Sequence, residues 1–334
     1  MGHRLLIVLV IAASALGART LPAAEKLDKI RFTYAPLSAS GFLWFIAKDS
    51  GYFEKNRLDV DMYFEGASPI MVQSILAGEN NFAGGLGPTA VTNVLQGGDV
   101  IPVACITHTF TTPMYVQPAI ANLQQLRGKK VGVSRIGSVS HLTADSILRR
   151  ARVGDVTILQ TGGIPESMAA IMTGNVDGAM VNPPNNIILR EKGFREIVGA
   201  KELKEMNLRF PENGIMVKRS WAEKNPDLVK RFIKSVAEGL KRMHDDRDFA
   251  IKTLSKYTKV TDAKSLDESY RWALDSFFKD FKTPPEAMQL MVDQLASSRM
   301  IDPNLAQKTP LKAFYENRYV EELEREGFFK KLWQ

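Results

Sequence analysis

The chain of 334 residues is poor in the residues on which disulfide, metal and nucleophile chemistry depends. It has one cysteine, Cys105, and four histidines. A single cysteine cannot form an internal disulfide, and the apolar stretch around Cys105 predicts a buried, unreactive thiol. The histidines lack the spacing of a metal-binding helix, and no CxxC, HExxH or GxSxG pattern occurs. We therefore expect no catalytic residues, no metal and no cofactor.

A strong excess of charge is also missing. The 44 lysines and arginines and 37 acidic residues give a formal net charge of +7. Nucleic-acid binders usually show a basic stripe interleaved with aromatic residues, and the nearest candidate here is the short segment 148–153, LRRARV. This segment is typical of the solvated end of a helix. We expect no nucleic-acid partner.

Long hydrophobic runs are absent except at the N-terminus. There Arg4 precedes an apolar run over 5–16, and small residues follow. This order is typical of a secretory signal peptide, and the run is too short to span a bilayer core of about 30 Å comfortably. We predict a signal peptide over residues 1–24 and a soluble mature protein in the periplasm. The candidate cleavage points follow Ala15, Ala18 or Ala24.

Strand-like and helix-like segments alternate along the first two thirds of the chain. The β-branched and aromatic residues of 30–35 and the alternation in 58–64 predict strands, and the segment 42–53 between them predicts a helix interrupted at Gly51. The same alternation continues from 129 to 199. It predicts an α/β fold with mostly parallel sheets flanked by helices.

One sequence unit occurs twice. Residues 75–88 read ILAGENNFAGGLGP, and residues 171–184 read IMTGNVDGAMVNPP. Each copy contains the end of a helix at a glycine, a short buried strand, and a loop with proline that begins the next helix. The repeat predicts two similar lobes.

Local signals also predict helix starts and a hinge. Ser68 before Pro69, and Asn182 before Pro183, predict the first residues of two helices. From about residue 220 the chain is largely helical, and we predict that these helices pack on the first lobe. The segments 107–118 and 208–218 look extended and are predicted to be the two strands that cross between the lobes.

Four stretches together resemble a known family. In chain order they are GYFEKNRLDVDMYF, SILAGENNFAGG, LQQLRGKKVGVSR and AAIMTGNVDGAMV. Within about residues 28–245 the chain resembles the periplasmic substrate-binding proteins of ABC importers, in the branch of nitrate, sulfonate, taurine and thiamine-pyrimidine-precursor binders. Two positions depart from the family pattern: Asn56-Arg57 replaces a common glycine turn, and Asn81 replaces a common aspartate.

The resemblance implies a two-lobed periplasmic-binding-protein fold (type II) with two hinge strands and a helical C-terminal part. It implies a first lobe formed by 27–112 and 212–334, and a second lobe formed by 113–211. It also implies that the lobes close over one small-molecule ligand. The expected partner is an ABC permease with its ATPase, through which alone the protein contacts the membrane, and the expected oligomeric state is a monomer.

Physical chemistry places the ligand beyond the C-terminal ends of the strands. There helix N-termini offer backbone N–H groups and partial positive charge. Six loops rich in Ser, Gly, Asn and Pro meet this description, at 36–41, 65–69, 84–88, 134–140, 161–165 and 182–185. The candidate ligand-binding residues in and near these loops are Ser38, Ser40, Gly41, Trp44, Ser68, Gly85, Gly87, Thr107, His108, Arg135, Gly137, Ser138, Gly163, Asn182 and Asn213.

The loop 134–140, SRIGSVS, suggests the chemistry of the ligand. Its hydroxyls and backbone N–H groups suit an oxyanion, and Arg135 either adds charge or is a solvated surface residue. Trp44 either stacks on a planar ligand or packs its helix on the sheet, and His108 is a possible donor at the hinge. We expect an organic anion such as a sulfonate or carboxylate. A pyrimidine precursor, an enzyme on the same two-lobed fold and a sensor that binds in the same way stay open.

Overall fold

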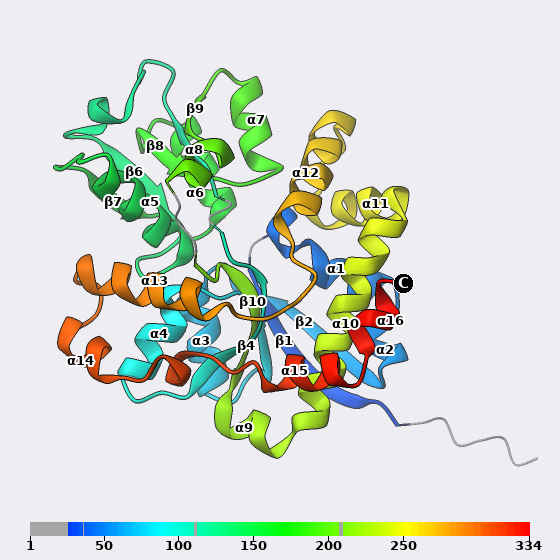
Figure 1. The fold of residues 1–334 in the computed structure, drawn as a ribbon. Coiled ribbons are helices and arrows are strands. Elements are labelled where there is room, and N and C mark those ends of the chain that lie inside the picture. Colours follow the sequence, from blue (N-terminus) through cyan, green and yellow to red (C-terminus); the bar gives the residue numbers. More distant parts are fainter. Residues whose placement is uncertain (1–25, 36, 110–111, 207–209) are drawn as a thin grey trace, which may run out of the picture.

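The computed structural model of the chain describes residues 26–35, 37–109, 112–206 and 210–334. The signal peptide predicted at 1–24 lies outside these residues. The described chain forms two α/β lobes, each built around a five-stranded sheet, as Figure 1 shows. The expected α/β fold is confirmed, and so is the strand predicted at 58–64, which forms between the same two residues.

The first sheet has the strand order β2-β1-β3-β10-β4. Strands β1, β2 and β3 run parallel, and β10 pairs antiparallel with both β3 and β4. β10 enters this sheet after the chain has completed the second one. The strands are β1 (Asp28–Tyr34), β2 (Leu58–Phe64), β3 (Phe82–Gly84), β4 (Val100–Thr107) and β10 (Asn213–Lys218).

The second sheet repeats this topology in the order β7-β6-β8-β5-β9. Strands β6, β7 and β8 run parallel, and β5 pairs antiparallel with β8 and β9. In each sheet, the fourth strand in this order runs antiparallel to both of its neighbours. This strand, β10 or β5, directly follows a crossing segment. The strands are β5 (Met114–Val116), β6 (Lys130–Val133), β7 (Thr157–Gln160), β8 (Gly178–Met180) and β9 (Arg195–Val198).

The sequence repeat occupies the same place in both lobes. Helix α3 (Ser68–Leu76) leads into β3, and helix α6 (Ile164–Met172) leads into β8. Between helix and strand, Gly78 and Gly174 have φ values of 79° and 75°, a backbone region that favours glycine. The third strand of each sheet is thus built from the same helix–glycine–strand unit, as the repeat predicts.

Helices cover both faces of the first sheet. Between the strands lie α1 (Phe42–Asp49), α2 (Tyr52–Lys55) and α4 (Pro88–Leu95), with a short 3-10 turn, η1 (Ala39–Gly41), before α1. The long helix α10 (Pro226–Asp245) packs against α1 and α2, and its Phe232 contacts the rings of Phe32, Phe53 and Phe82 inside the main apolar core. This core holds the strand ends of the first lobe in place.

Helices of the second lobe connect its strands in the same way. They are η2 (Leu123–Leu126), α5 (Val139–Arg150), α6, α7 (Asn185–Glu191) and α8 (Ala200–Glu205). Buried residues of α5, with Val131 and Val133 of β6, form a second apolar core. α5 and α6 follow the C-terminal ends of β6 and β7, so their first turns lie at the edge of the sheet that faces the first lobe.

Most helices of the C-terminal part pack on the first lobe alone. The helices α9 (Arg219–Lys224), α11 (Arg247–Thr258), α12 (Ala263–Ser276), α15 (Arg318–Arg325) and α16 (Phe328–Leu332) surround α10 and the first sheet (Figure 1). Helix α13 (Pro285–Ser297) contacts α4 of the first lobe and shares an apolar cluster with residues of the second lobe. It is followed by α14 (Pro303–Lys308) and η3 (Leu311–Phe314).

The prediction that these helices pack on the first lobe describes only part of the packing of α13, which contacts α4 of the first lobe and also the second lobe. Met288 and Met291 of α13 share an apolar cluster with Val91 of α4 and with Leu142 of α5. The preceding chain runs beside β4, where Cys105 N donates to the carbonyl of Phe281. Helix α13, which follows this segment, therefore lies between the lobes. The apolar stripe of a helix predicts burial but does not say against which core.

Two predicted helix starts are displaced. The residue before α3 is Ala67, which has extended backbone angles, so Ser68 is already the first helical residue and makes no capping bond. Helix α7 begins at Asn185, after a cis peptide bond between Pro183 and Pro184. The residue before a proline disfavours helical angles, and here two successive residues precede a proline. The helix consequently starts later than predicted.

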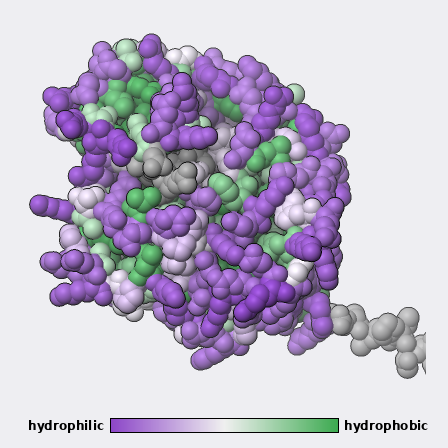
Figure 2. Space-filling view, in the orientation of Figure 1, coloured by the Kyte–Doolittle hydropathy of each residue, from purple (hydrophilic) through white to green (hydrophobic). Residues whose placement is uncertain are grey.

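The surface in Figure 2 is mainly hydrophilic, with apolar side chains in scattered patches. The exposed large apolar residues come from separate elements of both lobes: Tyr63, Phe64, Leu76, Ile136, Met172, Leu290 and Leu305. Within the described ranges, no helix combines the length and apolar character that crossing a membrane requires.

Candidate functional site

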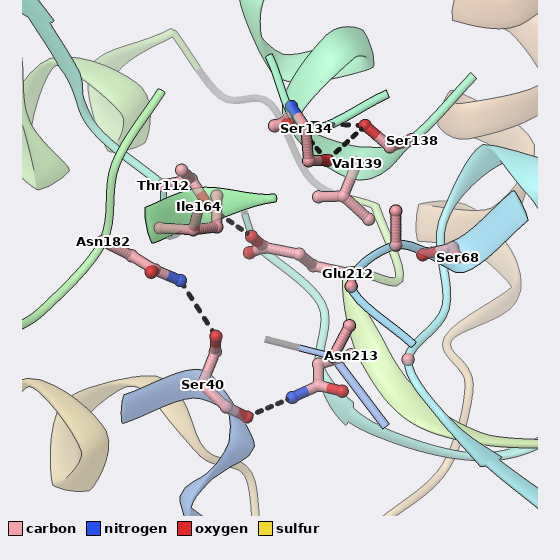
Figure 3. Close-up of a pocket in the computed structure, with 15 residues that line it drawn as sticks. Ser40, Ser68, Thr112, Ser134, Ser138, Val139, Ile164, Asn182, Glu212 and Asn213 are labelled. Atoms are coloured by element: carbon pink, nitrogen blue, oxygen red, sulfur yellow. Dashed lines mark hydrogen bonds between the residues drawn. The ribbon is translucent and has the colours of Figure 1, made fainter. Parts of the chain in front are cut away.

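A cavity lies where the two lobes meet, at the C-terminal ends of the parallel strands (Figure 3). Its volume is about 70 Å³. This is several times the roughly 10–15 Å³ that a cavity needs to hold a single water molecule. The residues that line it come from both lobes and from the crossing segments: Ala35, Ser40, Gly66, Ala67, Ser68, Gly85, Thr112, Ser134, Ser138, Val139, Ser140, Ile164, Asn182, Glu212 and Asn213.

The first lobe contributes small residues and one helix start. Gly66, Ala67 and Ser68 follow β2 and lead into α3, so the N-terminal turn of α3 lies beside the cavity. Glu65 supports this loop from behind, since its carboxylate accepts hydrogen bonds from Ser74 Oγ (3.0 Å) and Asn80 Nδ2 (3.3 Å). The loop presents hydroxyl and backbone groups with little side-chain bulk.

The second lobe contributes three buried serines at the start of α5. The hydroxyl oxygens of Ser134, Ser138 and Ser140 lie 2.9 to 3.0 Å from one another. Ser138 caps α5 by accepting from His141 N, and Ser134 N donates to Ser140 Oγ at 2.9 Å. Figure 3 shows Ser134 and Ser138 at one side of the cavity, with Val139 pointing into it.

Counting the protons of these serines shows what they can offer a ligand. Ser134 Oγ donates to Ser138 Oγ, and Ser138 Oγ donates to the carbonyl of Arg135 at 2.7 Å. Each hydroxyl has one proton, so Ser140 is the serine whose proton can turn to a ligand while these two bonds persist, in exchange for its own bond to Ser134 or Ser138. Together with the N–H groups and partial positive charge of the first turn of α5, it can bind an anionic or acceptor group.

The crossing segments contribute an acid to the cavity. Glu212, of whose side chain little is exposed, points to the middle of the cavity in Figure 3 and accepts a hydrogen bond from Thr112 Oγ1 at 3.0 Å. Its backbone N–H donates to the carbonyl of Thr107 at 2.8 Å, so the two crossing segments lie side by side. Glu212 is the one residue of the described lining with an ionisable side chain.

Asn182 joins the two lobes at the cavity. Its Nδ2 donates to Ser40 Oγ at 2.9 Å, and the neighbouring Pro183 carbonyl accepts from Ala39 N at 2.8 Å. From the first lobe, Asn213 Nδ2 donates to the carbonyl of Ser40 at 2.6 Å. Asn182 is 3% exposed, and its Oδ1 has no hydrogen-bond partner among the described residues. This oxygen can accept a hydrogen bond from a ligand.

The structure brings together about two thirds of the residues predicted from the sequence. On the lining lie Ser40, Ser68, Gly85, Ser138, Asn182 and Asn213. Four more predicted residues lie immediately behind the lining. Ser38 Oγ is hydrogen-bonded to Ser40 Oγ, and Gly163 directly precedes Ile164. Gly87 contacts Val139, and the Gly137 carbonyl accepts a hydrogen bond from Thr89 Oγ1. Ser134 and Ser140, from the predicted loop, also line the cavity.

The remaining predicted residues lie away from the lining. Trp44 is fully buried and its indole lies against Gly84, so it packs α1 on the sheet. His108 stacks on Phe278, with ring centres 3.7 Å apart. The carbonyl of Thr107 accepts a hydrogen bond from Glu212 N between the crossing segments. Gly41 and Arg135 are outside the lining as well. The aromatic rings of Trp44 and His108 thus serve packing here rather than the cavity.

Sequence reasoning missed Glu212 and Thr112, whereas Ile164 lies in the predicted loop 161–165. Glu212 directly precedes the predicted residue Asn213 in the segment PEN, inside a stretch predicted to cross between the lobes. An acid within such a stretch would have been the available signal. Thr112 carries no comparable signal, since its role depends on how the lobes meet.

His141 makes the serine loop sensitive to pH. Its Nδ1 accepts a hydrogen bond from Gly137 N at 3.0 Å, and burial lowers the pKa of His141 although Asp145 acts in the opposite direction. Because the pKa is lower in the folded state, the neutral ring stabilises the fold above the unfolded pKa of about 6.5, and this stabilisation is lost as pH falls through the folded value.

We therefore expect wild type to lose more thermal stability than His141→Gln between pH 7 and pH 5. Protonation removes the lone pair that accepts from Gly137, whereas the glutamine does not titrate in this range. Melting temperatures of the two proteins across this interval measure the effect. Parallel pH profiles would show that His141 does not contribute.

The two lobes with a cavity between them are those of the periplasmic-binding-protein fold. The chain belongs to the family described as NMT1/THI5 like, whose model matches residues 42–250. The resemblance found in the sequence is thereby confirmed. Within the described residues no group of three or more His, Cys, Asp or Glu could hold a metal ion.

Two curated relatives are named as binding proteins. One, from Bacillus subtilis (strain 168), is 23% identical over 210 residues, which are 61% of this chain and 60% of the relative. The other, from Brucella abortus (strain 2308), is 26% identical over 235 residues, 67% of this chain and 70% of the relative. The match thus spans less than two thirds of the first relative's length.

Three solved structures share the fold. A protein from Bordetella bronchiseptica RB50 has a TM-score of 0.80 at 17% identity, covering 90% of this chain and 98% of its own. The alkanesulfonate-binding protein of Xanthomonas axonopodis pv. citri, bound to MOPS, has a TM-score of 0.70 at 17% identity. The match covers 83% of this chain and 95% of that protein. The periplasmic nitrate-binding protein of Synechocystis PCC 6803 has a TM-score of 0.70 at 12% identity. The match covers 90% of this chain and 88% of that protein.

Proposed function

We propose that this protein is an exported solute-binding protein that captures a small molecule between its lobes in the periplasm and delivers it to an ABC permease with its ATPase. The observation that carries the proposal is the cavity lined by both lobes and by the crossing segments. A ligand that contacts both walls favours the closed arrangement over the open one. The protein acts as a monomer and contacts the membrane through the permease.

Family and fold support this assignment. The chain belongs to the NMT1/THI5-like family, and proteins of the same fold include binders of alkanesulfonates and of nitrate. The described lining places no histidine, lysine or cysteine beside its serines, and its one ionisable group is Glu212, which accepts a hydrogen bond from Thr112. Binding therefore suits the cavity better than catalysis.

The charges around the cavity favour an organic anion that also carries N–H groups. The first turns of α3, α5 and α6 lie beside it, and each helix N-terminus is equivalent to roughly half a positive charge. The carboxylate of Glu212 opposes them. An acidic group of the ligand would lie against α5 and Ser140, and an ammonium or amide group would lie against Glu212. Small amino acids and aminosulfonates have this combination.

A pyrimidine precursor is the second candidate. Glu212 and the Oδ1 atom of Asn182 are two acceptors at the cavity, and an amino-substituted heterocycle presents matching donors. Such a ligand needs no anionic group. The two candidates differ in how they depend on the start of α5.

The test combines native mass spectrometry of the protein with calorimetric titration of small sulfonates, carboxylates, amino acids and aminopyrimidines. We expect one ligand per chain. We expect Glu212→Gln to weaken ligands that carry an ammonium or amino group by about 10- to 100-fold, because a hydrogen bond to a charged group contributes roughly 1.5–3 kcal/mol. A ligand without N–H groups should bind the variant at least as well. Unchanged affinity for every amino-bearing ligand would remove Glu212 from the site.

A further inference from the structure

An ion pair joins the lobes away from the cavity. Nη2 of Arg190, on α7 of the second lobe, lies 2.5 Å from Oε2 of Glu268, on α12 of the first lobe. Figure 1 shows α7 and α12 facing each other across the gap between the lobes. Among the ion pairs formed by described residues, this is the one that spans both lobes. The lining of the cavity does not include either residue.

Arg190 also interacts electrostatically with its own lobe. Glu196 on β9 is within electrostatic reach of the guanidinium and accepts a hydrogen bond from Tyr115 Oη at 2.5 Å. Both of these residues belong to the second sheet, so they accompany Arg190 when the lobes separate. Glu268 belongs to the other lobe and does not. Opening therefore removes one of the two carboxylates near Arg190.

We propose that Arg190 and Glu268 are positioning residues that set the affinity for the ligand through closure, without touching the ligand. The proposal rests on the opening and closing of the lobes described under the proposed function. The side chains are 45% and 34% exposed, so salt screens their attraction. Pairs of this exposure usually change an equilibrium by roughly two- to five-fold.

The experiment measures the ratio of closed to open molecules without any ligand. Spin labels on Thr173→Cys in the second lobe and Lys252→Cys in the first report the distance between the lobes, and the native Cys105 is too buried to react. The ratio is compared for wild type, Arg190→Ala, Glu268→Ala and the charge exchange Arg190→Glu with Glu268→Arg, in 20 mM and 500 mM NaCl. These salt concentrations change the screening length from roughly 20 Å to 4 Å.

We expect each alanine variant to lower the closed-to-open ratio about two- to five-fold in low salt, and high salt to lower the wild-type ratio by a similar factor. The charge exchange should restore the ratio. The control is Arg271→Ala, which removes an ion pair with Asp267 on the same helix but none between the lobes. This variant should behave as wild type.

Two outcomes would overturn the inference, and they can be told apart. Equal ratios in wild type and in both alanine variants, with open molecules present, would exclude the ion pair while leaving closure intact. A single distance in every protein and at every salt concentration would exclude both the ion pair and the proposed closure.

Discussion

Replacing Gly87 with alanine is expected to lower ligand affinity by roughly 10- to 100-fold. Gly87 lies in the first lobe before α4, and a Cβ atom there would lie 2.5 Å from Cγ2 of Val139, the first residue of α5 in the second lobe. Overlap of this size in packed regions costs about 1–3 kcal/mol. The cost arises where the lobes meet, so it should fall mainly on closure. Calorimetric titration of the ligand identified by mass spectrometry measures it.

A matched control separates closure from backbone strain. Gly87 has a φ of 90°, which an alanine adopts at a cost, but Gly97 at the other end of α4 has a φ of 84° and nothing within 4 Å of its Cβ position. Gly97→Ala should therefore bear the same strain without losing affinity. Adding Val139→Ala to Gly87→Ala should recover part of the binding. Equal losses in both glycine variants would contradict the steric explanation.

Replacing Phe232 with alanine is expected to lower the free energy of unfolding by about 3–5 kcal/mol. Phe232 is fully buried on α10. Its ring stacks on Phe82 with centres 4.2 Å apart, and the rings of Phe32 and Phe53 lie 5.2 Å away. The four residues connect α10 to β1, α2 and β3, so the neighbouring backbone cannot easily fill the space. Urea denaturation followed by circular dichroism measures the loss.

The comparison variant is Leu305→Ala on α14. Leu305 is 42% exposed, and exposed substitutions usually change stability by less than about 0.5 kcal/mol. A similarly small effect in Phe232→Ala would mean that the helical C-terminal part contributes little to the stability of the first lobe.

The sequence predicted the parts of the fold that depend on short-range patterns. The alternation in 58–64 gives β2 because its apolar residues face the core at every second position. Gly78 and Gly174 end equivalent helices because both adopt positive φ angles. The small polar residues after the strands line the cavity because parallel strands end at the same edge of each sheet.

Features that depend on long-range packing could not be predicted in this way. The apolar stripe of α13 looks like those of α10 and α12, yet α13 packs both on α4 of the first lobe and against residues of the second lobe. Trp44 lies next to a polar loop in the sequence, but its ring points into the core. Glu212 reaches the cavity because the crossing segments lie between the lobes. Each of these outcomes depends on a partner distant in the chain.

The most direct test of the account is the distance between the lobes, measured by the spin labels at positions 173 and 252 as the identified ligand is added. The account predicts two distances in the free protein, and a shift to the shorter one at one ligand per chain. In Gly87→Ala the same ligand concentration should leave most molecules at the longer distance. A ligand that binds without any change in the distance distribution would contradict closure around this cavity.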